Sequence, residues 1–269
     1  MFSGPNGDQP PDADPQAPLS SHQPPASGHQ APASSPQPPI ERLIALLEVL
    51  LCSDYPTQFA LGATFAALGV RPFAANGQLL VGYVVALSLA DTALLIALIV
   101  MFLRAHGERP RDVLLGARPV GRELVIGILT TFVALVIGIG ILAAIQTFAP
   151  SLHTVEHNPF QELIRTPQGA AIFVLVVIVA GGVREEIQRA FLLHRFDVWL
   201  GGGPVGVAIT SVAFGAGHLL QGVDAAMATG TLGAFWGVLY LRRRSAVAPV
   251  VSHSGFNVLQ IVQSLAIGH

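Results

Sequence analysis

The sequence has little charge and no lysine. Asp, Glu, Lys and Arg make up 11% of its 269 residues. Soluble globular domains contain about 25% charged residues, so this composition excludes an ordinary soluble domain. We interpret the exclusive use of arginine for the 14 basic positions as genomic composition bias rather than as a functional signal. A formal net charge of −2 and the lack of a basic patch with interleaved aromatic residues exclude nucleic-acid binding.

Cysteine is also scarce. Cys52 is the one cysteine, so the chain cannot form an internal disulfide. We interpret Cys52 as a small buried residue near a helix end rather than as a catalytic thiol. Hydrophobic residues make up 52% of the chain. This composition predicts an all-α, polytopic bundle of transmembrane helices.

The chain divides into two parts by composition. Residues 1–38 consist mostly of Pro, Ser, Gln, Ala, Gly and His, and they cannot bury a hydrophobic core. We predict a disordered N-terminal tail at 1–38 and a transmembrane helical domain at 39–269. The tail lacks the basic and apolar regions of a signal peptide.

Seven apolar segments follow, each close to the roughly 20 residues that cross a bilayer. Pro56 predicts a kink in the first segment. Asp91 is the one carboxylate of the second segment, and we favour a helix-packing role for it beside Ser88 and Thr92 over a place in a polar network. The predicted spans lie at about 40–70, 78–103, 123–148, 171–196, 203–220, 223–241 and 246–266.

A more polar stretch at 149–169 separates the third and fourth spans, and it predicts a short amphipathic helix on the membrane surface. His153, Glu156 and His157 have a spacing that a metal could use. We favour solvated side chains there, because the three residues lie in a polar loop.

Arginine indicates the orientation of the spans. If the spans alternate, residues 104–122, Arg195 and 242–244 lie on one side and concentrate positive charge there. The positive-inside rule makes that side cytoplasmic. We therefore expect a multi-pass protein of a bacterial inner membrane, with a cytoplasmic N-terminus and membrane lipids around the bundle.

The fourth span carries charge where hydrocarbon is expected. AIFVLVVIVAGGVREEIQRAFLLHRF places Arg184, Glu185, Glu186 and Arg189 inside an apolar run. Charged groups at that depth are costly unless they find partners in the bundle interior, so the cluster indicates a functional site. We expect Arg189 to pair with one glutamate and to leave the other free for chemistry.

Two later spans carry polar residues at helical spacing. Phe214 and His218 form F-x-x-x-H, and His253 and Asn257 form H-x-x-x-N. Residues four apart share one face of a helix. A single histidine in a span is usually a packing residue. If these side chains and the glutamates face one cavity, they can hydrogen-bond to one another, which offsets the cost of placing each of them in hydrocarbon.

Such a cavity suits hydrolysis. A glutamate can act as a base for water, and neutral donors can stabilise the oxyanion of a tetrahedral intermediate. Two histidines and a carboxylate can also hold zinc. We favour a mechanism without a metal, because H-E-x-x-H is absent and the nearby arginines oppose a dication.

With the glutamate pair, F-x-x-x-H and H-x-x-x-N in this order on late spans, the sequence resembles the CPBP family of intramembrane proteases. This is the group of the CAAX prenyl endopeptidase and of bacteriocin-processing and immunity proteins. The resemblance covers about residues 120–266. It implies an endopeptidase acting on a membrane-embedded or lipidated protein. It assigns catalysis to Glu185 or Glu186, His218, His253 and Asn257, with Arg189 and Phe214 supporting the site.

The first motif departs from the family pattern, in which arginine follows the first glutamate by five residues. In REEIQR, Arg189 follows Glu185 by four, so Arg184 takes the first glutamate's place when no gap is allowed. A π-bulge could absorb the one-residue difference. The alternative functions are a non-catalytic membrane partner, such as an immunity protein, and a proton-linked transporter. The transporter is disfavoured because no inverted repeat is visible.

Overall fold

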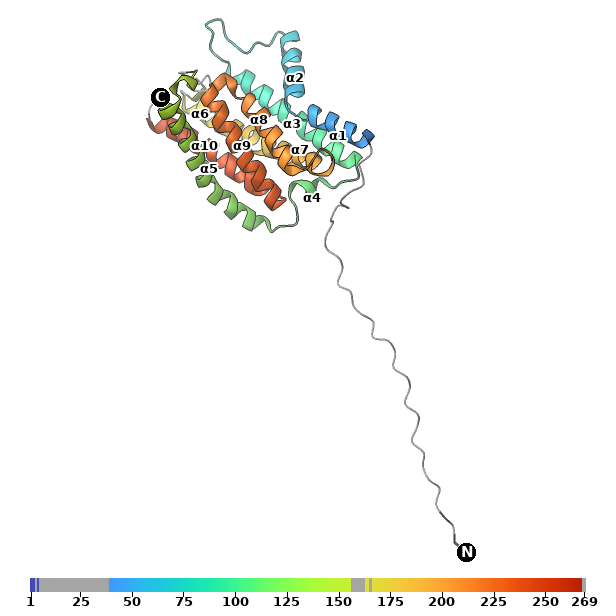
Figure 1. The fold of residues 1–269 in the computed structure, drawn as a ribbon. Helices are drawn as coiled ribbons and strands as arrows, with labels where there is room; N and C mark the ends of the chain where they lie inside the picture. Colours follow the sequence, from blue (N-terminus) through green and yellow to red (C-terminus); the bar gives the residue numbers. More distant parts are fainter. Residues whose placement is uncertain (3, 5–38, 156–162, 165, 268–269) are drawn as a thin grey trace. The chain divides into compact units, whose positions relative to one another are not determined.

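The computed structural model describes residues 1–2, 4, 39–155, 163–164 and 166–267. The predicted disordered tail lies outside these residues except for positions 1, 2 and 4. The described chain is helical, and its one β pairing is an isolated bridge between Phe73 and Leu79. The predicted all-α class is therefore confirmed (Figure 1).

The first predicted span is broken into α1 (Pro39–Leu51) and α2 (Tyr55–Ala67), which are bent by 46°. The break lies at Asp54, whose φ of 79° is in a region that non-glycine residues rarely adopt. Pro56 sits in the first turn of α2, where a helix tolerates proline. The bend lies directly before Pro56, where a proline interrupts the preceding helical turn, so the predicted kink near Pro56 is confirmed.

The second and third predicted spans are continuous helices, α3 (Val81–Ala105) and α5 (Val120–Phe148), joined through the short α4 (Pro110–Leu114). Within the described residues these two helices are long and apolar enough to cross a membrane, and the bent α1–α2 pair makes up to three. The count of seven spans is therefore not confirmed and stays a prediction.

The fourth predicted span begins earlier than expected and has three parts. It consists of α6 (Pro167–Val176), the π-helix η3 (Val177–Arg184) and α7 (Glu185–Trp199). Two glycines of η3 allow a close approach to the last helix. A Cβ atom on Gly182 would overlap Ser254, and one on Gly181 would lie 2.8 Å from Asn257 Nδ2.

The C-terminal part consists of α8 (Gly203–Ala216), the turn η4 (Leu219–Gln221), α9 (Val223–Arg243) and α10 (Val247–Ile267). α8 is shorter than the predicted span at 203–220 and ends before His218. Small residues bring α8 and α9 together, since a Cβ on Gly215 would lie 2.7 Å from the Ala226 carbonyl oxygen.

The predicted surface helix at 149–169 stays a prediction, because residues 156–162 and 165 of that stretch lie outside the described residues. Residues Pro150–Leu152 form one 3₁₀ turn, 153–155 have no regular structure, and α6 begins at Pro167. His153 pairs with Asp224 at 2.7 Å. Glu156 and His157 lie outside the described residues.

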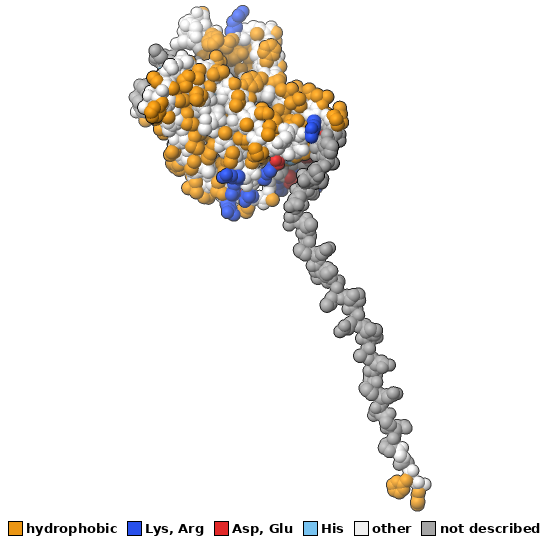
Figure 2. Space-filling model, viewed as in Figure 1, with side chains coloured by type: hydrophobic (Ala, Val, Ile, Leu, Met, Phe, Trp, Pro, Cys, Tyr) orange, Lys and Arg blue, Asp and Glu red, His pale blue; other side chains and the backbone are white. Residues whose placement is uncertain are grey.

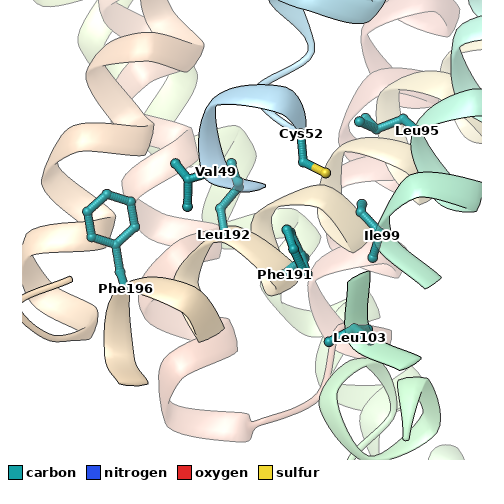
Figure 3. Close-up of a cluster of buried hydrophobic side chains, with 8 residues drawn as sticks. All are labelled: Val49, Cys52, Leu95, Ile99, Leu103, Phe191, Leu192 and Phe196. Atoms are coloured by element: carbon teal, nitrogen blue, oxygen red, sulfur yellow. The ribbon is translucent and has the colours of Figure 1, made fainter. Parts of the chain in front are cut away.

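The helices pack around several apolar clusters. α10 runs along α5 and η3, and α8 runs along α9. A cluster drawn in Figure 3 joins α1, α3 and α7 and includes the fully buried Cys52, as predicted for that residue. Its members are Val49, Cys52, Leu95, Ile99, Leu103, Phe191, Leu192 and Phe196.

Large apolar side chains cover much of the outer surface, as the orange atoms in Figure 2 show. Val136 on α5 is 73% exposed, and many neighbours on the same helix are also exposed. Exposed apolar surface of this extent fits contact with lipid chains. Arginine side chains gather at one end of the helices, at the lower edge of the view (Figure 2).

Candidate active site

Glu186 is the buried member of the glutamate pair, with 1% of its surface exposed. Its Oε1 accepts hydrogen bonds from Arg189 Nη1 and from His253 Nδ1, the latter at 2.8 Å. A buried carboxylate requires partners of this kind. Glu186 is therefore held by α7 and α10 together.

Glu185 faces a different environment. Its side chain is 14% exposed, and its Oε1 accepts a hydrogen bond from Arg184 Nη2 at 3.1 Å. Its Oε2 lies 3.8 Å from His253 Nε2, which is too long for a direct hydrogen bond. The imidazole of His253 therefore lies between the two glutamates, with one ring nitrogen toward each.

Arg184 connects Glu185 to two further helices. Its Nη1 donates to Asp54, at the start of α2, and to Asp91 on α3 at 2.8 Å. Asp91 thus belongs to a polar network, and the predicted helix-packing role is wrong. Thr92 instead donates to the Ser88 carbonyl oxygen within its own helix, at 2.7 Å.

Trp236 of α9 fixes the plane of the His253 ring. The two rings stack with centroids 3.8 Å apart and an interplanar angle of 16°. The indole Nε1 donates to Ser252 Oγ at 3.1 Å, and Trp236 is 1% exposed. A fully buried indole with its donor satisfied is a rigid support for the imidazole.

Phe214 links His218 to the charged cluster. Its ring lies 4.6 Å from Arg189 Cζ and packs edge-on against His218, with centroids 4.8 Å apart. His218 follows the end of α8, and its Nδ1 lies 2.8 Å from the Phe214 carbonyl oxygen. Because a carbonyl oxygen only accepts, Nδ1 carries the proton, and in the neutral ring Nε2 holds the lone pair.

Asn257 lies one turn beyond His253 on α10, and its amide nitrogen is beside Gly181 of η3. The structure thus groups both glutamates, Arg189 and His253 by direct contacts, with Phe214 packed against them. Among the described residues, no hydrogen bond joins His218 to either glutamate.

Two contributors to the site, Asp54 and Trp236, belong to none of the motifs that the sequence offers. An acid between two helices, such as Asp54, or within a span, such as Asp91, indicates a possible partner for an arginine inside the membrane. Nothing local marks Trp236, because its role depends on α9 packing against α10.

A metal site requires several ligands that converge on one point. In the part of the chain that the structure describes, no group of three or more His, Cys, Asp and Glu side chains is arranged to hold a metal ion. Arg184 and Arg189 instead occupy the positions nearest the carboxylates. Catalysis without a metal stays a prediction.

Comparison with known families identifies the segment that carries these residues. Residues 167–259 match the model of the Rce1-like type II CAAX prenyl endopeptidase family. This segment runs from α6 into α10 and includes every predicted site residue, and the match confirms the resemblance to the CPBP family. No curated protein and no solved structure matches the chain. Together with the helices that are long and apolar enough to cross a membrane, the match supports a membrane protein.

Proposed function

Given an Rce1-like endopeptidase domain at 167–259, we propose that the protein is an intramembrane endopeptidase that cleaves a membrane-embedded or lipidated protein. The observation that carries this proposal is the placement of His253 between Glu186, which is buried, and Glu185, which is partly exposed. Such an arrangement separates a structural carboxylate from a reactive one.

Glu185 is the proposed base. Glu186 is fully buried, with Arg189 and His253 bonded to Oε1 and no partner for Oε2 among the described residues. Glu185 is partly exposed and keeps Oε2 without a hydrogen bond among those residues. A gap of 3.8 Å between Glu185 and His253 suits a bridging water. Arg184 holds the other oxygen of Glu185, so the carboxylate keeps a fixed direction.

In the proposed reaction, Glu185 takes a proton from water while the oxygen forms a bond to the carbonyl carbon of the substrate. The Asn257 amide, and His253 when protonated, donate to the resulting oxyanion. The carbon–nitrogen bond then breaks, and the proton passes from Glu185 to the leaving amine. His218, with its Nε2 lone pair, assists in orienting the water.

A non-catalytic membrane partner is the second candidate, and one observation favours it. Counted back from Arg189, the first glutamate of the family pattern falls at Arg184, a cation that cannot act as a base. The π-helix η3 ends at Arg184, so it does not add a residue between the pair and Arg189. A non-catalytic partner would use the same residues to bind a peptide without cleaving it.

Proteolysis by the purified protein distinguishes the two. The substrates are a farnesylated peptide with a CAAX terminus, the same peptide without the lipid, and a hydrophobic transmembrane peptide, all analysed by mass spectrometry. We expect cleavage of at least one membrane-associated peptide, lost in Glu185→Gln, a folded variant of equal size. Binding of the peptides without cleavage by the wild type would support the non-catalytic partner.

A further inference from the structure

Exposed arginines form a rim at one end of the bundle. They come from the last turn of α3, from α4 and its flanks, from the first turn of α5 and from the last turn of α9. We call these residues the arginine rim: Arg104, Arg109, Arg111, Arg118, Arg122 and Arg242. Figure 2 shows arginine atoms gathered at this edge of the molecule.

The rim is assembled by contacts between distant parts of the chain. Arg118 donates from Nε to the Arg243 carbonyl oxygen at 2.7 Å. The Ala246 amide donates to the Leu114 carbonyl oxygen at 2.7 Å, and a Cβ on Gly116 would overlap the Arg244 carbonyl oxygen. The loop before α5 is therefore fixed on the turn between α9 and α10, and arginines of both segments are brought together.

The acids at this end do not neutralise the rim. Glu108, Glu123 and Asp197 pair with Arg195, Arg243 and Arg244, none of which belongs to the rim. Asp112 is the remaining exposed acid in the segment between α3 and α5.

Among the described residues, Arg118 bonds only to backbone carbonyl oxygens, and the other rim arginines have no hydrogen-bond or ion-pair partner for their side chains. Guanidinium groups held together in this way repel one another unless anions from outside the chain bind between them. Arg122 also lacks a favourable electrostatic environment within the chain, because it lies in the first turn of α5, where the helix dipole disfavours a cation.

Apolar neighbours of the rim indicate where the anions come from. Leu115, Val120 and Leu124 are 43%, 52% and 43% exposed, and they alternate along the chain with Arg118 and Arg122. Apolar and cationic side chains side by side at the end of lipid-facing helices match the boundary between acyl chains and headgroups. Guanidinium groups bind phosphate oxygens in a two-pronged geometry.

From this placement we propose that the arginine rim binds the phosphate groups of anionic phospholipids. The site takes several lipid headgroups along its edge rather than one in a pocket, because its arginines derive from four helix ends. This proposal is independent of catalysis and of the proposed protease function.

Lipid-dependent stability tests the proposal. The protein is delipidated in a nonionic detergent, and its unfolding temperature is followed during titration with phosphatidylglycerol, phosphatidylcholine or soluble glycerol phosphate. The test variant carries Arg109→Gln, Arg122→Gln and Arg242→Gln, three rim positions without described partners. Arg71→Gln, an exposed arginine between α2 and α3, is the control.

We expect phosphatidylglycerol alone to raise the unfolding temperature of the wild type and the control. Affinity for this lipid should fall about fivefold for each rim arginine removed. Native mass spectrometry of the wild type should show phosphatidylglycerol retained in preference to phosphatidylcholine. The proposal is overturned if the triple variant responds as the wild type does, or if the two lipids act equally. The proposal is also overturned if soluble glycerol phosphate stabilises the wild type, or if neither lipid does.

Discussion

The ion pair between Arg189 and Glu186 should be the most costly single interaction to break. Both side chains are almost fully buried, at 5% and 1% exposure. Removing one member of a buried pair costs about 3–5 kcal/mol, because the other charge stays buried without compensation. Arg189→Met keeps most of the side-chain volume and removes the charge, so we expect a loss within this range. The lost contact with the Phe214 ring adds to it.

A double-mutant cycle separates the uncompensated charge from lost packing. Glu186→Gln keeps an acceptor for His253 and removes the carboxylate. Combined with Arg189→Met, it leaves no buried charge at the pair, so part of the stability should return. Residues within one network couple by about 0.5–3 kcal/mol, and we expect a value near the upper end. Denaturant unfolding in mixed micelles gives the four free energies of the cycle.

The pair between Arg244 and Asp197 is the matched control, since its side chains are 54% and 31% exposed. Exposed pairs contribute about 0–1 kcal/mol, so Arg244→Met should cost little. An equal, small loss of stability for Arg189→Met and Arg244→Met would refute the reasoning. Failure of the double variant to recover any stability would show that packing, rather than charge, determines the effect.

Three further predictions concern activity and pH. Asn257→Ala should lower kcat by a factor of about 10²–10³, which is the usual effect of losing an oxyanion donor. The unfolding temperature should stay the same. An unchanged kcat would show that Asn257 does not belong to the site. Activity should survive dialysis against a strong chelator, and loss reversed by zinc alone would contradict this. Burial raises the pKa of Glu108, but hydrogen bonds and charge from His194 and Arg195 lower it more, so it lies below the ordinary 4.5. The stability that Glu108 contributes is therefore present above about pH 4.5 and lost as the pH falls through its folded-state pKa. Thermal unfolding across this range should show a smaller acid loss for Glu108→Gln than for the wild type.

Helix positions could largely be predicted from the sequence, because apolar runs of bilayer length have few alternative structures. The spans at 78–103 and 123–148 differ from α3 and α5 by a few residues at their ends. The size of the bend between α1 and α2 could not be predicted, since it accompanies the backbone conformation of Asp54, whose side chain is bonded to an arginine 130 positions away. The position of the break could be predicted, because Pro56 disfavours a helix in the residues just before it.

The residues of the candidate site could be predicted from the sequence, but which glutamate pairs with Arg189 could not. Glutamates and an arginine inside an apolar run are conspicuous because hydrocarbon penalises them. Helical spacing alone could not decide that Glu186, rather than Glu185, pairs with Arg189, since three-residue and four-residue separations both allow contact. That choice depends on α10, which places His253 against Glu186, and on α2 and α3, whose acids hold Arg184.

The π-helix before Glu185 has a consequence for how this membrane segment tolerates changes in length. A π-helical turn contains more residues than an α-helical one, so removing a single residue from η3 can restore the ordinary pitch. One residue of an α-helix corresponds to a rotation of about 100°. A deletion from an ordinary α-helix would turn the flanking residues by this angle. A deletion from η3 would instead leave α6 and α7 facing as they do now, because the wider turn had taken up the extra residue. The membrane segment can therefore lose one residue there while the side chains of α6 and the glutamates of α7 keep their directions.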